Sequence, residues 1–188
     1  MSFPSDGEAF ELVEEGEGLL DDVAEFAQAL GTGPRSWGMH DAFDDGTAYR
    51  AELSARVGQP VLSDDPIVRR GLQLPDSWWQ DLTGALENVS AVATGRVAVR
   101  RQYMDRAIPE FLGISAPAVT CWTSAHADLH WANVTAPLKV LDWEGWGQAP
   151  EGFDGATLYA YSLLQPDTAA RVRAAFPVLG SPVELRHR

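Results

Sequence analysis

Residues 118–158 of the chain read AVTCWTSAHADLHWANVTAPLKVLDWEGWGQAPEGFDGATL, and this stretch decides how the rest is interpreted. It holds two polar clusters, HADLHWAN at 126–133 and LDWE at 141–144. Each cluster follows an apolar run rich in β-forming residues, at 119–122 and at 138–141. Apolar runs of this length that end in turn-forming residues are typical of strands. The pattern predicts a short β-hairpin with acidic groups where its strands end.

The spacing of the polar residues suits phosphoryl transfer. That reaction asks a protein mainly for positioning and for neutralisation of charge, with one carboxylate near the attacking hydroxyl. Mg²⁺ takes oxygen ligands and keeps several of its waters, so two protein side chains can hold it. An H-x-D-x-x-x-x-N segment followed by a strand that ends in Asp supplies this set. His126, Asp128, Asn133 and Asp142 occupy those places.

The same residues carry a family resemblance. HADLHWAN followed by LDWE resembles the catalytic and metal-binding loops of the aminoglycoside phosphotransferase and choline kinase-like group, relatives of the protein kinases. A later Asp in a D-x-A-x-L context is typical of that group, and Asp154 begins such a segment, DGATL. The resemblance implies an enzyme that uses ATP and Mg²⁺ to phosphorylate a hydroxyl of a small molecule.

The resemblance also implies a role for each residue of the motif. Asp128 is the expected catalytic base, and Asn133 and Asp142 are the expected magnesium and cofactor ligands. The expected supporting residues are His126 as a structural residue, Glu144 orienting metal-bound water, and Asp154 bracing the catalytic loop through backbone N–H groups.

Two other interpretations of the stretch remain open. Asp, Asn and His favour turns, so the clusters could be ordinary hairpin turns. His126, Asp128 and His130 could instead share one face of a strand and bind Zn²⁺ in a metal-dependent hydrolase, with His40 or Asp142 completing the site. The chain has no H-E-x-x-H segment and no pair of cysteines to support zinc.

Composition narrows the class of protein. The chain has 188 residues, 45% of them hydrophobic and 22% charged, which suits one globular domain. Its net charge of −13 argues against a nucleic-acid partner, because such partners need a basic surface. An acidic surface attracts cations, so a cationic acceptor fits the composition.

Cysteine use and hydropathy bear on localisation. Cys121 is the one cysteine, so the chain can form no internal disulfide, and a reducing cytoplasm fits. Its place in an apolar run predicts a buried, inert thiol. The N-terminus lacks the pattern of a signal peptide, and no apolar run is long enough to span a membrane.

The fold expected from the resemblance is α+β and mainly helical. It is a protein-kinase-like C-terminal lobe with a short catalytic β-hairpin and with the N-terminal β-lobe largely absent. Lys139 is the one lysine, and it lies inside the motif, so it cannot be the lysine that pairs with the phosphates of ATP. The expected divisions are a flexible lead-in at 1–8, the lobe at 9–178 and a tail at 179–188. Within the lobe they are a hinge at 9–18, a helical part at 19–116, the catalytic and metal loops at 117–158, and C-terminal helices at 154–178.

Local patterns predict elements within these divisions. We expect helices at 19–30, 47–57 and 96–104, a loop at 31–46, and further helices that start near 63–66, Pro75, Asp154 and Pro166. The helix after Pro75 should bury Trp78, Leu82, Leu86 and Val89. Arg96, Arg100 and Arg101 should form a solvated helix face. Most of the seven Trp should pack in the core.

Three accounts of the missing lobe remain. The chain could be a minimal phosphotransferase that covers ATP by forming a homo-oligomer or by using Arg35 or the cluster Arg96–Arg101, or it could pair with a separate N-terminal lobe. It could be a non-catalytic, kinase-like binding module. It could also be a gene fragment whose other lobe is encoded upstream.

Overall fold

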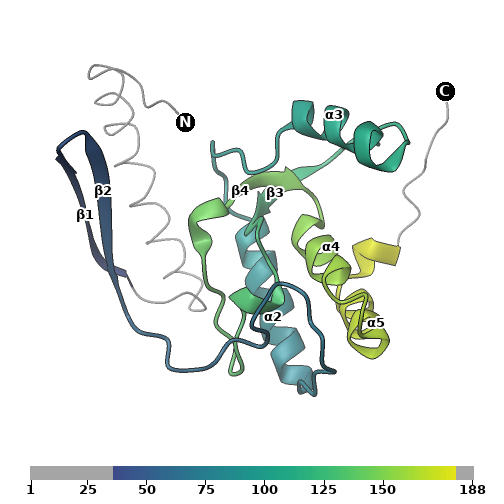
Figure 1. Ribbon diagram of the computed structural model, residues 1–188. Helices are drawn as coiled ribbons and strands as arrows, with labels where there is room; N and C mark the ends of the chain where they lie inside the picture. The colour runs from purple at the N-terminus through teal and green to yellow at the C-terminus, as the bar shows by residue number, and fades with distance from the viewer. Residues whose placement is uncertain (1–35, 181–188) are drawn as a thin grey trace. The chain divides into compact units, whose positions relative to one another are not determined.

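The computed structural model describes residues 36–180, which fall into two compact units, residues 36–57 and residues 58–180. Each unit is described by itself. The predicted lead-in at 1–8, hinge at 9–18, helix at 19–30 and most of the tail lie outside the described residues. Within residues 36–180 the fold is mixed α+β, with four α-helices and two small antiparallel sheets (Figure 1).

The first unit is a β-hairpin of β1 (Ser36–Asp44) and β2 (Thr47–Ser54), paired antiparallel from Asp44 and Thr47 to Gly38 and Leu53, with a register shift between Ser36 and Gly38. Its turn is Asp45-Gly46, and both residues have positive φ, 47° and 75°. Asp-Gly with this backbone favours a tight two-residue hairpin turn, because its twist matches that of the strands. The predicted loop at 31–46 and helix at 47–57 are therefore wrong over 36–54, and the predicted helical part at 19–116 contains a hairpin.

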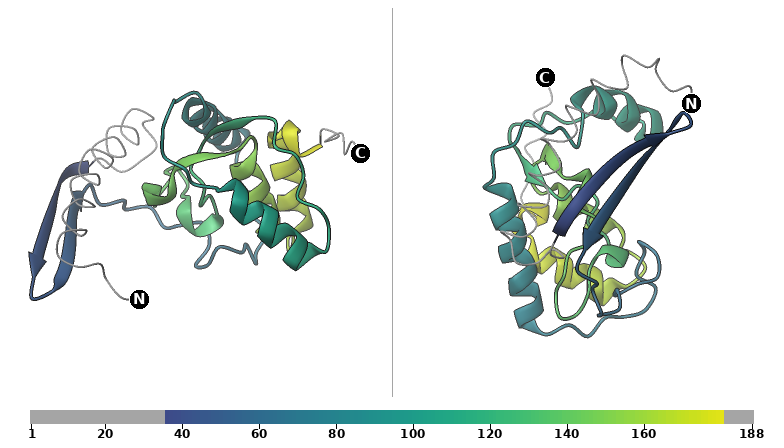
Figure 2. Two further views of the ribbon diagram at one scale, coloured as in Figure 1. Left: turned by 90° about the horizontal axis from the view of Figure 1, so that it is seen from above. Right: turned by 90° about the vertical axis from the view of Figure 1, so that its left-hand side faces the viewer.

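Helix α2 (Asp76–Ser90) is the centre of the second unit and confirms the helix predicted after Pro75. Trp78, Leu82, Leu86 and Val89 are buried as expected, together with Trp79. The helix lies against β3 (Trp122–Ala125) and α5 (Pro166–Ala175), as Figure 2 shows. Burial of this apolar face stabilises the unit.

Indole rings connect α2 to the motif. The ring of Trp131 stacks on that of Trp78 with centroids 6.3 Å apart and meets Trp79 edge-on at 6.2 Å. Trp131 donates from Nε1 to Ser162 Oγ at 2.9 Å, and Trp78 donates from Nε1 to the Thr135 carbonyl at 2.8 Å. Trp131, Trp143 and Trp146 are buried, which confirms the core role expected of the tryptophans, whereas Trp122 is only half-buried.

The predicted strand at 138–141 is not the partner of β3. Strand β3 pairs instead with β4 (Gly147–Pro150), in register from Ala125 and Gly147 to Trp122 and Pro150. Residues 133–135 and 139–141 bond to each other, with Thr135 N–H donating to Lys139 O at 3.1 Å and Leu141 N–H donating to Asn133 O at 2.8 Å. The predicted hairpin is thus replaced by two short pairings: β3 with β4, and residues 133–135 with residues 139–141.

Residues 96–99 run beside β4 and are not helical, contrary to the predicted helix at 96–104. Gln148 N–H donates to Arg96 O at 2.9 Å, and Ala98 N–H donates to Gln148 O at 3.1 Å. This approach is close, because a Cβ on Gly147 would lie 2.9 Å from Ala98 N. Helix α3 (Arg101–Leu112) starts later and ends at Gly113, whose φ of 67° is usual after a helix C-terminus.

Other local predictions differ in outcome. The helix predicted from 63–66 is wrong, because Asp65 Oδ1 accepts from Ile67 N–H at 2.8 Å and holds a turn instead. Helices α4 (Phe153–Ala160) and α5 begin where predicted, and the short 3₁₀ turn Pro177–Gly180 ends the described chain. Cys121 is exposed, so the expectation of a buried thiol is wrong. None of the helices within residues 36–180 has the length and apolar character needed to cross a membrane.

Candidate active-site loops

The segment His126–Asn133 is a loop in which some side chains are buried and others are exposed. His126, Leu129, Trp131 and Asn133 are buried, and the last two belong to the 3₁₀ turn Trp131–Asn133. The side chain of Asp128 is 51% exposed. Apolar and amide groups therefore anchor the loop in the core, and one carboxylate is left at the surface.

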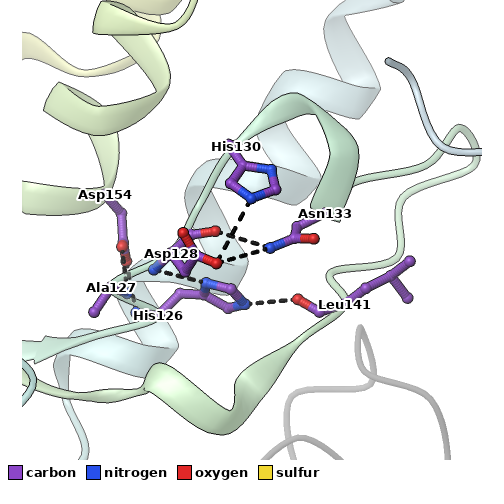
Figure 3. A network of polar contacts seen from close by, with 7 residues as sticks. All are labelled: His126, Ala127, Asp128, His130, Asn133, Leu141 and Asp154. Atoms are coloured by element: carbon purple, nitrogen blue, oxygen red, sulfur yellow. Dashed lines mark hydrogen bonds and ion pairs between the residues drawn. The ribbon is translucent and has the colours of Figure 1, made fainter. Parts of the chain in front are cut away.

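Asp154, at the start of α4, holds this loop by its backbone (Figure 3). Its Oδ2 accepts from His126 N–H and its Oδ1 accepts from Ala127 N–H, both at 2.8 Å. Ala127 has a φ of 69°, a conformation that costs an L-residue roughly 1–2 kcal/mol. The two hydrogen bonds offset that cost, since they fix the N–H groups of Ala127 itself and of the residue before it. The backbone contact expected of Asp154 is present.

The ring of His126 joins the loop to the residue before Asp142. Its Nε2 lies 2.8 Å from the Leu141 carbonyl, which can only accept, so Nε2 carries the proton. Its Nδ1 accepts from Asp128 N–H at 3.3 Å, and the ring meets Trp143 edge-on at 4.7 Å. Burial lowers the pKa of His126, against the smaller opposing effects of the nearby carboxylates of Asp154, Asp128 and Asp142. His126 is therefore a neutral, structural residue.

These contacts do not fit the zinc interpretation. Both ring nitrogens of His126 are engaged within the protein, so neither is available to a metal. Over residues 36–180, no three His, Cys, Asp or Glu side chains gather where they could hold a metal ion. His40 belongs to the hairpin of the first unit.

Asp128 is positioned by two neighbours in its own loop (Figure 3). Asn133 Nδ2 donates to the Asp128 carbonyl at 3.0 Å and reaches Asp128 Oδ2 at 3.4 Å. His130 Nε2 lies 3.6 Å from the same Oδ2. Because the amide nitrogen of Asn133 faces Asp128, its amide oxygen is the atom that can serve a cation.

The second loop, residues 142–146, presents two acids at the surface. Asp142 and Glu144 are exposed, and Asp142 has a left-handed φ of 60° before the 3₁₀ turn Trp143–Gly145. Trp143 between them is buried and donates from Nε1 to the Val140 carbonyl at 2.8 Å. The structure thus directs both carboxylates away from the core.

Arg96 holds the second loop, a role that the sequence did not suggest. Its Nη2 donates to Glu144 O at 2.7 Å, its Nε donates to Trp146 O at 2.9 Å, and its guanidinium lies 5.7 Å from the Trp146 ring centroid. The predicted solvated helix face is therefore wrong for Arg96. No local pattern reveals the role, because the carbonyls it binds are 48 and 50 residues further along the chain.

The two loops are bound to each other. Leu141, next to Asp142, accepts from the His126 ring and donates to Asn133 O at 2.8 Å, so it contacts both ends of the first loop. Burial raises the pKa of Asp154, although its two N–H partners favour the charged form. The structure brings His126, Asp128, Asn133 and Asp154 together and places Asp142 at the end of a segment bonded to them. Within residues 36–180, the contact that holds Glu144 is the hydrogen bond from Arg96 to its backbone carbonyl.

Comparison with known proteins adds nothing to this geometry: no family model, no curated protein and no solved structure matches the chain.

Proposed function

We propose that the chain is an ATP-dependent phosphotransferase acting on a hydroxyl of a small molecule, built like the C-terminal lobe of the aminoglycoside phosphotransferase-like kinases. In this proposal Asp128 is the catalytic base, and Asn133 and Asp142 would hold the magnesium that accompanies ATP. His126 and Asp154 position the loop, and Glu144 would orient water near that ion.

The observation that carries the proposal is that hydrogen bonds around His126 connect the two acid-bearing loops, residues 126–133 and 142–146. Asp154 binds two backbone N–H groups of the first loop, and the His126 ring binds the carbonyl that precedes Asp142. An ordinary hairpin turn does not need a buried carboxylate to fix its backbone. An exposed carboxylate on a fixed loop is what a general base requires, because catalysis depends on holding it within hydrogen-bond reach of the substrate.

The oxygen donors of the site fit Mg²⁺. The Asp142 carboxylate and the Asn133 amide oxygen are hard ligands of the type this ion prefers. When bound, magnesium would supply neutralisation of the phosphate charge. The residues of the chain do the rest: Asp128 accepts the proton of the attacking hydroxyl, while Asn133 and the backbone bonds of Asp154 keep that carboxylate in place.

The test is a calorimetric titration with ATP, with and without Mg²⁺, followed by assay of phosphate transfer to a panel of small hydroxyl compounds. The wild type should bind ATP in a Mg²⁺-dependent way. Asp142→Asn should weaken that binding about tenfold or more, through loss of a charged ligand. Asp128→Asn should leave binding within about twofold but lower the transfer rate by about 10²–10⁴, the usual contribution of a general base.

Asp64→Asn is the matched control, because Asp64 is an exposed acid outside the motif and its loss changes the net charge equally. It should bind ATP and transfer phosphate as the wild type does. Absence of Mg²⁺-dependent binding at millimolar ATP would contradict the proposal. Binding without transfer to any acceptor would favour a non-catalytic binding module.

A further inference from the structure

A pocket of about 800 Å³ opens beside the first loop, between α3, residues 97–99 and the start of α4. Ala127, the residue before Asp128, forms part of its wall. The volume of the pocket lies within the range of about 300–1,000 Å³ that is typical of small-molecule sites. The pocket therefore adjoins the first loop at Ala127.

The wall of the pocket is largely apolar. Val97, Val99, Met104, Ile108 and Phe153 contribute aliphatic and aromatic surface. Val97 and Tyr103 are each 56% exposed, so this surface meets solvent when the pocket is empty. A ligand with an apolar body would remove it from water, which is favourable in proportion to the area covered.

The charged groups of the wall are all cationic. Arg100 and Arg106 line the pocket, and the described residues that line it include no Asp or Glu. The neighbouring Arg101 differs, because it binds Asp105 at 2.8 Å and the Pro117 carbonyl at 3.0 Å. Arg106 lies 5.7 Å from the Tyr103 ring centroid, a contact that leaves its N–H donors available. Arg100 also precedes the N-terminus of α3, whose dipole adds positive potential.

We propose that this pocket binds a small molecule with an apolar body and one anionic group, held by Arg100 and Arg106. A cationic wall is unexpected in a chain with a net charge of −13. The charge of the ligand is therefore set by the arginines of the pocket and not by the net charge of the chain. If the proposed function holds, the acceptor of the phosphate is such an anionic hydroxyl compound. The cationic acceptor suggested by composition would then be wrong, since guanidinium groups repel it.

The test uses 8-anilinonaphthalene-1-sulfonate, an aromatic anion, and its neutral parent N-phenyl-1-naphthylamine as fluorescent probes. No ATP or Mg²⁺ is present, so the result does not depend on the proposed function. The double variant Arg100→Gln/Arg106→Gln should bind the sulfonate about tenfold more weakly, as expected for loss of charge-assisted hydrogen bonds, and bind the neutral probe as before. High salt should weaken sulfonate binding to the wild type only.

The matched control is Arg70→Gln/Arg173→Gln, which removes the same charge at exposed positions outside the pocket wall. It should bind the sulfonate as the wild type does. A third variant, Val97→Asp, places a carboxylate in the exposed apolar wall and should abolish sulfonate binding without unfolding the chain. Equal sulfonate affinity in the wild type and the Arg100/Arg106 variant, or equal losses in both double variants, would overturn the proposal.

Discussion

The two acid-bearing loops of the site are held in opposite ways. The first loop, residues 126–133, is fixed from the core side by the Asp154 carboxylate on its N–H groups and by the buried indole of Trp131. The second loop, residues 142–146, also has buried indoles, those of Trp143 and Trp146, but its carbonyls are bound from the outside by the half-buried guanidinium of Arg96. The difference teaches that the backbone of the Asp128 loop depends on a buried carboxylate, whereas the backbone of the Asp142 loop depends on a half-buried arginine, so we expect loss of the second support to disturb the core less.

The largest expected change in stability comes from removing the buried indole of Trp131, which anchors the first loop in the core. Trp131→Ala should lower the free energy of unfolding by about 3–5 kcal/mol, the range for truncating a buried aromatic ring. Urea denaturation followed by circular dichroism measures it. Trp122→Ala, at a half-buried indole in β3, should cost clearly less. Similar losses in the two variants would remove the distinction between anchored and peripheral rings.

The next effect concerns the brace itself. Asp154→Ala leaves the N–H groups of His126 and Ala127 without their acceptor, at about 1–3 kcal/mol for each buried group. We expect a loss of roughly 2–4 kcal/mol and rapid hydrogen exchange at the amide of Ala127. Unchanged exchange at that amide would show that the loop keeps its conformation without Asp154.

A smaller effect is expected when the second loop is released. Arg96→Ala should cost about 1–2 kcal/mol, because the carbonyls it frees can bind water. Mg²⁺-dependent ATP binding should weaken, while exchange at the amide of Ala127 stays slow. Arg96→Lys should not restore binding, since one ammonium cannot match the planar fork that binds two carbonyls. Fast exchange at the amide of Ala127 in Arg96→Ala would contradict separate support of the two loops, because the first loop would then also depend on Arg96.

The smallest effect is the pH dependence contributed by His126. Burial lowers the pKa of the folded state, so the unfolded chain binds more protons below about pH 6.5 and stability falls as the pH is lowered. Between pH 7 and pH 6 this amounts to less than about 1 kcal/mol. Asp154 has the opposite sign, because its raised pKa lets protonation stabilise the fold as pH falls. Denaturation curves of wild type and His126→Gln at both pH values measure the effect of the histidine, including its effect on the neighbouring Asp154. A steeper acid loss in His126→Gln would contradict the assignment.

Elements with a local cause could be predicted from the sequence. Pro75-Asp76 and Pro166-Asp167 start helices where those residue types usually do, and the apolar spacing of α2 selects its buried face. The bonds of Asp154 could be anticipated because a motif fixed the order and spacing of the residues, although no propensity scale contains them.

Elements with an ambiguous or distant cause could not be predicted. Tyr49, Leu53 and Val57 are four residues apart, which suits a helix face but is also an even spacing that places residues on one face of a strand. Asp45-Gly46 would have decided for the hairpin. The partner of β3 and the role of Arg96 depend on contacts across the fold, and a single sequence shows neither.

Asp154 lies far along the sequence from the N–H groups that it binds, and this distance has a consequence for biosynthesis. The carboxylate lies 27 and 28 residues after the N–H groups that it binds, so the complete HADLHWAN segment is synthesised before its brace exists. Contacts of this separation form late in folding, because closing the intervening chain has an entropic cost. A released chain truncated before residue 154 should therefore contain every residue of the first loop without its native backbone conformation, and Asp128 should gain its position only when α4 is present.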